Sequence, residues 1–149
     1  MTPQAERQME LTLPMVPDIE IAAARAAGNL GREIGMSAED VDEMAHAVVE
    51  ACINAREHSY CVDQRIYLRF RGSSPDVQTL KVEVWITDNG QGFNLEEARL
   101  RRRGLSNTGP KKRGWGLQIM EAHMDEVEIS TSENGTTVRM VKYGERKKL

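Results

Sequence analysis

The segment Glu50-Ala51-Cys52-Ile53-Asn54 lies near the middle of the 149-residue chain, and the interpretation of the sequence starts from it. Asn54 follows Glu50 by four positions, so a helix places their side chains on one face, one turn apart. An amide oxygen is a hard ligand that suits Mg²⁺, and a nearby carboxylate can orient or deprotonate an attacking hydroxyl. On its own, however, this pattern is more typical of an ordinary polar helix face.

A second segment, Asp88-Asn89-Gly90-Gln91-Gly92, follows a predicted strand. Functional groups often gather where a strand gives way to a loop. The Asp88 carboxylate can accept a hydrogen bond from the amino group of adenine, and glycines without a Cβ let a base approach the backbone closely. Taken alone, Asp-Asn-Gly is also a common turn sequence.

A third segment, Gly114-Trp115-Gly116-Leu117, opens a predicted helix after a basic stretch. The free N–H groups of a glycine-rich helix start favour a phosphate. We expect residues 99–113 to form a lid that closes on a nucleotide, with Lys112 or Arg113 reaching the γ-phosphate. A solvated charged segment is the simpler alternative for this stretch. Only together, and in this order, do the three segments predict an ATP pocket.

The rest of the sequence predicts an α+β fold. Its strands alternate apolar and polar residues, which is typical of strands with one buried face rather than of a fully buried parallel sheet. We therefore expect a mixed, mainly antiparallel sheet with helices packed on one side. The expected strands cover residues 9–13, 66–70, 80–87, 127–129 and 138–140, and the expected helices cover 19–34, 38–58, 95–103 and 115–123.

Length and composition limit the alternatives. A chain of this length suits one domain, residues 1–149, with a core over about 9–143. The net charge of -3 argues against direct nucleic-acid binding. No apolar stretch is long enough to span a bilayer, and no secretory signal is visible at the start. Cys52 and Cys61 lack the spacing of a metal or redox site, which fits a reducing cytoplasm.

With these motifs, the sequence resembles the GHKL ATPase superfamily. Within it, the chain is most similar to the stand-alone anti-sigma factor serine kinases of bacterial partner-switching systems. The likeness covers about residues 9–143, and it implies a two-layer α/β sandwich of the Bergerat type. It rests on Val49–Tyr60, Asp88–Phe93, Gly114–Met120, Met124–Val127 and Gly135–Val138.

The resemblance also implies a role for each matching residue. Glu50 would be the catalytic base, Asn54 would bind the nucleotide through Mg²⁺, and Asp88 would bind the adenine. Thr136 would support the adenine contact, although Thr137 is an alternative at this position. The other implied nucleotide-binding residues are Gly90, Gly92, Lys112, Arg113, Gly114, Gly116 and Leu117.

The same resemblance implies a homodimer with two protein partners. One partner is a sigma factor, which the protein sequesters. The other is a STAS-domain anti-sigma factor antagonist, which it phosphorylates on serine or threonine. Two alternatives remain: an ATP-gated binding module without phosphotransfer, and the ATP-binding half of a histidine kinase. The second is disfavoured, because nothing before Met9 supplies a helix with the phosphorylated histidine.

Overall fold

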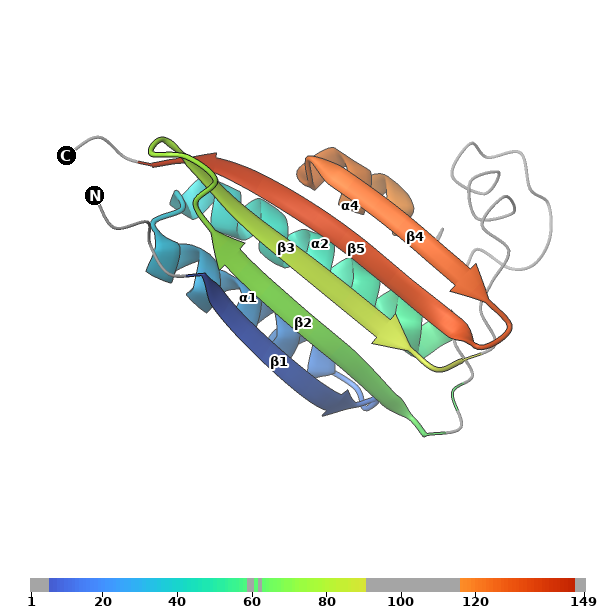
Figure 1. Cartoon of the computed structure of the whole chain (residues 1–149). Coiled ribbons are helices and arrows are strands. Elements are labelled where there is room, and N and C mark those ends of the chain that lie inside the picture. Colours follow the sequence, from blue (N-terminus) through green and yellow to red (C-terminus); the bar gives the residue numbers. More distant parts are fainter. Residues whose placement is uncertain (1–5, 59–60, 62, 91–115, 147–149) are drawn as a thin grey trace.

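The computed structural model describes residues 6–58, 61, 63–90 and 116–146. These residues form a five-stranded sheet with the strand order β1-β2-β3-β5-β4, and helices cover one of its faces (Figure 1). The elements are β1 (Arg7–Pro14), α1 (Ile19–Ile34), α2 (Ala38–His58), β2 (Arg65–Ser73), β3 (Thr79–Asp88), α4 (Leu117–His123), β4 (Glu126–Ser132) and β5 (Gly135–Glu145).

The predicted α+β architecture is confirmed. Neighbouring strands of the described sheet pair antiparallel throughout, so the parallel contribution expected of a mixed sheet is not found within these ranges. The strands are longer than the apolar alternation predicted, because backbone pairing continues past the alternating apolar residues, as over residues 141–145 of β5. The predicted helix over 95–103 and the lid over 99–113 lie outside the described residues.

Helices α1 and α2 begin and end where the sequence predicts. Gly35 ends α1 in the left-handed conformation, with φ 103° and its N–H donating to the carbonyl of Arg32. Two residues later, the Ser37 hydroxyl accepts the backbone N–H of Asp40 at 3.1 Å, which caps the start of α2. Helix α4 begins at Leu117 rather than at the expected residue 115, because Gly116 adopts φ 65° at its N-cap.

One hydrophobic core lies between the sheet and the helices. Phe70 of β2, Val84 of β3 and Met140 of β5 face it and are fully buried. Met44 on α2 and Met120 on α4 approach it from the helical layer. The core therefore fixes how α2 and α4 sit over the middle strands. None of the helices in the described part is both long and apolar enough to cross a membrane.

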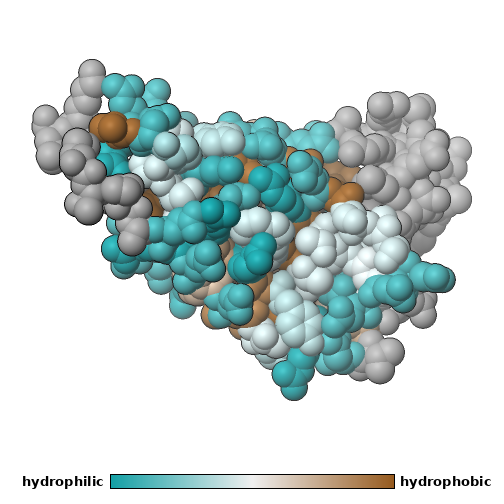
Figure 2. All heavy atoms as spheres, in the orientation of Figure 1, coloured by the Kyte–Doolittle hydropathy of each residue, from teal (hydrophilic) through white to brown (hydrophobic). Residues whose placement is uncertain are grey.

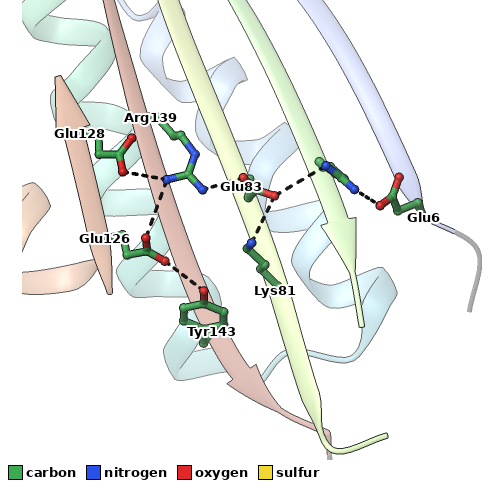
Figure 3. Close-up of polar contacts among 8 residues, drawn as sticks. Glu6, Lys81, Glu83, Glu126, Glu128, Arg139 and Tyr143 are labelled. Atoms are coloured by element: carbon green, nitrogen blue, oxygen red, sulfur yellow. Dashed lines mark hydrogen bonds and ion pairs between the residues drawn. The ribbon is translucent and has the colours of Figure 1, made fainter. Parts of the chain in front are cut away.

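The opposite face of the sheet carries a polar network (Figure 3). At its centre, Glu83 is only 6% exposed and accepts a hydrogen bond from Arg139 at 2.9 Å. Arg139 also forms ion pairs with Glu126 and Glu128 of β4, and Arg71 of β2 pairs with Glu83, so the network joins four strands. Figure 2 shows that hydrophilic residues cover much of this face. Burial of apolar side chains therefore packs the helices against one face of the sheet, whereas ion pairs link neighbouring strands on the other face.

Candidate active site

Helix α2 supplies one wall of a cavity between the helical layer and the sheet. Ala51, Asn54 and Ala55 line it, and the Asn54 side chain is half-buried there. Glu50 lies one turn before Asn54 on the same helix and is also half-buried. The small alanine side chains leave space beside the amide, so the helix presents a polar group within an otherwise apolar wall.

The end of β3 supplies the opposite wall. Asp88 is only 4% exposed and lines the cavity. Its Oδ1 accepts the backbone N–H of Gly90 at 2.9 Å and the thiol of Cys61 at 3.8 Å. A buried carboxylate is costly unless hydrogen bonds compensate for its lost hydration. A carboxylate held in this way, in the wall of an apolar cavity, suits the recognition of a hydrogen-bond donor on a ligand.

The two threonines that were alternatives in the sequence lie on opposite faces of β5. Thr136 is buried, lines the cavity and is the register partner of Asp88. Its hydroxyl lies 2.9 Å from the hydroxyl of Thr131. Thr137 points the other way, because successive residues of a strand alternate, and its hydroxyl lies 3.0 Å from that of Thr87. The cavity therefore receives Thr136 and not Thr137.

The cavity is narrow. Its volume is about 20 Å³, which is room for about one water molecule. A purine therefore enters only when lining side chains move outward. Leu117 and Met120 belong to the short helix α4, and a methionine side chain adapts readily to a new neighbour. The complete lining consists of Ala51, Asn54, Ala55, Ile86, Asp88, Leu117, Met120, Ile129, Thr136 and Val138.

The first and third sequence segments meet where α4 begins. A Cβ added to Gly116 would lie 2.6 Å from Oε2 of Glu50 and 3.0 Å from its Cβ. Two independent reasons therefore favour glycine at this position. A side chain would clash with Glu50, and the φ of 65° is unfavourable for residues other than glycine. The backbone at the start of α4 is therefore in direct contact with the Glu50 side chain. This contact places a carboxylate beside the segment that was predicted to hold phosphates.

A second glycine supports the site. The sequence marked it as part of the matching segment Gly135–Val138, without a role of its own. Gly135, the first residue of β5, has φ 141°, and a Cβ there would lie 2.2 Å from the carbonyl oxygen of Asp88. The hairpin turn therefore packs directly on the backbone that carries Asp88. Sequence reasoning also missed the contact of Cys61 with Asp88, because no local pattern signals a contact between residues 27 positions apart.

The structure thus brings one set of predicted residues together and leaves another undescribed. Around the cavity and the start of α4 lie Glu50, Asn54, Asp88, Gly90, Gly116, Leu117 and Thr136. Outside the described ranges are Gly92, Lys112, Arg113 and Gly114.

The donors around the cavity limit how a metal ion could be held. Within the described ranges, no group of three or more His, Cys, Asp or Glu side chains is placed to hold a metal. Mg²⁺ that is bound to nucleotide phosphates keeps several waters and takes only one or two protein oxygens. The amide oxygen of Asn54, half-buried at the cavity, suits that limited role.

The chain is similar to proteins of a known family. Residues 16–142 match the family described as the histidine kinase-like ATPase domain. A serine-protein kinase RsbW from Bacillus licheniformis is 28% identical over 98% of this chain and 91% of its own length. The RsbW of Bacillus velezensis is 30% identical, over 93% of this chain and 88% of its own length.

A solved structure shows the same fold. The crystal structure of the RsbU and RsbW domains of Rv1364c from Mycobacterium tuberculosis superimposes with a TM-score of 0.70 at 22% identity. The match covers 95% of this chain and 33% of that chain. By its family match and its near full-length relatives, the chain belongs to the histidine kinase-like ATPase family and, within it, to the serine-protein kinases of the RsbW type.

Proposed function

We propose that this kinase transfers the γ-phosphoryl group of ATP to a serine or threonine of a STAS-domain anti-sigma factor antagonist. The observation that carries the proposal is the contact of the Glu50 carboxylate with Gly116 at the start of α4. A protein that only senses nucleotide needs a pocket for it but no carboxylate beside the phosphate-binding segment. The position of Glu50 therefore favours phosphoryl transfer over simple binding.

The cavity would receive the adenine. Asp88 would accept a hydrogen bond from the exocyclic amino group, and Thr136 beside it would support that contact. The apolar side chains of Ile86 and Val138 would pack on the ring. This combination of apolar walls and a few convergent polar groups is typical of cofactor and nucleotide pockets.

The triphosphate would extend from the cavity toward α4. We infer that backbone N–H groups of Gly114, Gly116 and Leu117 bind the phosphates, with Gly90 and Gly92 allowing close approach near the base. Asn54 would be the protein ligand of Mg²⁺, and the ion would reduce the negative charge on the phosphates. Lys112 or Arg113 would contact the γ-phosphate from the lid.

Glu50 would act as the general base. It would accept the proton of the substrate hydroxyl as the hydroxyl oxygen bonds to the γ-phosphorus. The bond between that phosphorus and the β,γ-bridging oxygen breaks, and ADP is the leaving group. Phosphoryl transfer depends mainly on positioning and charge stabilisation, so the position of Glu50 against the start of α4 is the feature that matters for this role.

We further propose that the protein sequesters a sigma factor and acts as a homodimer. Support comes from the relatives, which are named serine-protein kinase RsbW, and from the resemblance to anti-sigma factor kinases. In such a switch, phosphorylation of the antagonist would leave the kinase bound to the sigma factor. An unphosphorylated antagonist would compete for the kinase and release the sigma factor.

The test uses purified protein, labelled ATP with Mg²⁺ and a cognate STAS-domain antagonist. Glu50→Gln should reduce label transfer by at least about 100-fold and leave the ADP affinity within about twofold. Glu39→Gln is the matched control, because Glu39 is exposed in the first turn of the same helix. Tight ATP binding without any transfer by the wild type would remove the kinase assignment. Partner switching that survives Glu50→Gln would favour a binding module.

A further inference from the structure

A buried thiol lies against the residue that is proposed to recognise adenine. Cys61 is 3% exposed, and its S–H donates to Oδ1 of Asp88 with a sulfur–oxygen distance of 3.8 Å. The backbone N–H of Gly90 donates to the same oxygen at 2.9 Å. Both of these donors therefore act on Oδ1, one from the segment after α2 and the other from the residues after β3.

We propose that Cys61 is a positioning residue for adenine recognition: with Gly90, it fixes the Asp88 carboxylate so that Oδ2 is presented to the base. This inference rests on the proposed function, because it takes Asp88 to be the adenine acceptor. A carboxylate is attached through one broad torsion angle, so a single donor leaves it free to pivot. Two donors on one oxygen restrict that rotation.

The surroundings of Cys61 keep its thiol protonated, and only a protonated thiol can donate a hydrogen bond to Asp88. Burial and the nearby Asp88 carboxylate raise the pKa of Cys61 to about 11, so the sulfur keeps its proton at neutral pH. The position of the residue is also fixed, since the side-chain amide of Gln64 donates to the Cys61 carbonyl. A thiol is a weak donor in water, but a buried hydrogen bond is electrostatically stronger.

A fixed acceptor gives the site a preference among purines. Adenine carries an amino group at its sixth position, which donates to a carboxylate. Hypoxanthine carries a carbonyl oxygen there, and two acceptors repel each other. A site built to bond a donor rejects the analogue that lacks it, because its buried polar group then has no partner in the ligand. If the carboxylate can rotate, its hydrogen bond with the adenine amino group becomes weaker, and its repulsion of the hypoxanthine carbonyl oxygen also becomes weaker.

The experiment compares ADP with IDP, both with Mg²⁺, by equilibrium binding to the full chain. Cys61→Ala removes the donor, so the ADP affinity should fall about threefold to tenfold while the IDP affinity stays within about twofold. Cys61→Ser restores a donor of similar size and should keep the ADP/IDP ratio within about twofold of wild type. Cys52→Ala is the matched control, because it removes a thiol that is equally buried but lies in the core.

The outcomes separate this inference from the proposed function. An unchanged ADP/IDP ratio in Cys61→Ala overturns the positioning role and leaves nucleotide binding intact. A Cys61→Ser ratio that falls with that of Cys61→Ala also overturns it, because the donor would then be irrelevant. If the wild type binds neither nucleotide, the proposed function fails as well. Should Cys61→Ala be too unstable, Cys61→Val fills the space without a donor and carries the same expectation.

Discussion

Replacing Gly116 by alanine tests the contact on which the proposed catalysis depends. The new Cβ would lie 2.6 Å from Oε2 of Glu50, whereas ordinary contacts at such a carbon begin at 3.4 Å. Its distance of 3.0 Å from the Cβ of Glu50 is also too short. The Glu50 side chain therefore has to leave its position, and the backbone of residue 116 must hold φ 65° with a side chain attached.

The substitution should lower both the stability of the fold and the rate of phosphoryl transfer, and the two losses are measured separately. Holding an alanine in the left-handed conformation costs about 1–2 kcal/mol, and moving Glu50 off its rotamer costs about 0.5–1.5 kcal/mol. The free energy of unfolding should therefore fall by about 1.5–3.5 kcal/mol, the sum of the two costs. The carboxylate moves by roughly 0.8 Å, and a misplacement of about 1 Å costs about 100-fold in rate. Phosphoryl transfer should thus fall far more than stability alone explains.

The assay measures label transfer from ATP to the antagonist, together with urea unfolding of each variant. Gly35→Ala is the matched control: Gly35 has φ 103°, and the nearest atom to its added Cβ is 3.8 Å away, so it reports backbone strain without a clash. Gly116→Ala should also have little further effect in a Glu50→Ala background, since the two residues act through one contact. Transfer within about twofold of the Gly35→Ala rate would refute the reasoning.

Three further predictions concern the support of the site. Gly135→Ala places a Cβ 2.2 Å from the Asp88 carbonyl oxygen, so urea unfolding should show a loss of about 3 kcal/mol or more, and a loss below about 1 kcal/mol contradicts the packing. Thr136→Val should weaken ADP about threefold to tenfold in a binding titration, whereas Thr137→Val should not; equal effects would disprove the assignment of faces. The Lys142 ammonium, 2.5 Å from the Glu43 carboxylate, lowers the pKa of Glu43 below its ordinary value of 4.5. Because that folded pKa is depressed, the pair stabilises the fold above pH 4.5 and loses this effect as the pH falls through the folded value. Thermal unfolding should therefore show that Glu43→Gln destabilises the protein more at about pH 7 than at about pH 3, and an equal effect at both would argue against the ion pair.

Local signals explain which elements the sequence could predict. The bounds of α1 and α2 follow from residues beside them, since Gly35 ends one helix and Ser37 caps the next. The strands follow from the alternation of apolar and polar residues, because one face of each lies on the core. The start of α4 was predicted two residues too early, because the left-handed conformation of Gly116 depends on its neighbours in space.

The composition of the site was predictable, but its supporting contacts were not. Glu50 and Asn54 are one turn apart on a helix, so their common face follows from spacing alone. The contacts of Gly135 and Cys61 with Asp88 cross between separate elements. The Gly135 contact depends on the register of the sheet, and the Cys61 contact depends on the path of the chain after α2. No short sequence pattern encodes the register or that path. The choice of Thr136 over Thr137 likewise needed the register, because a shift by one residue exchanges the two faces.

The central claim is that segments far apart in the chain meet to bind one nucleotide. Equilibrium dialysis of labelled ADP with Mg²⁺ against the pure, folded protein tests it most directly. We expect saturable binding at about one nucleotide per chain, with at least about tenfold weaker binding after Asp88→Asn. No saturable binding by the wild type, or equal affinities of wild type and Asp88→Asn, would contradict the account.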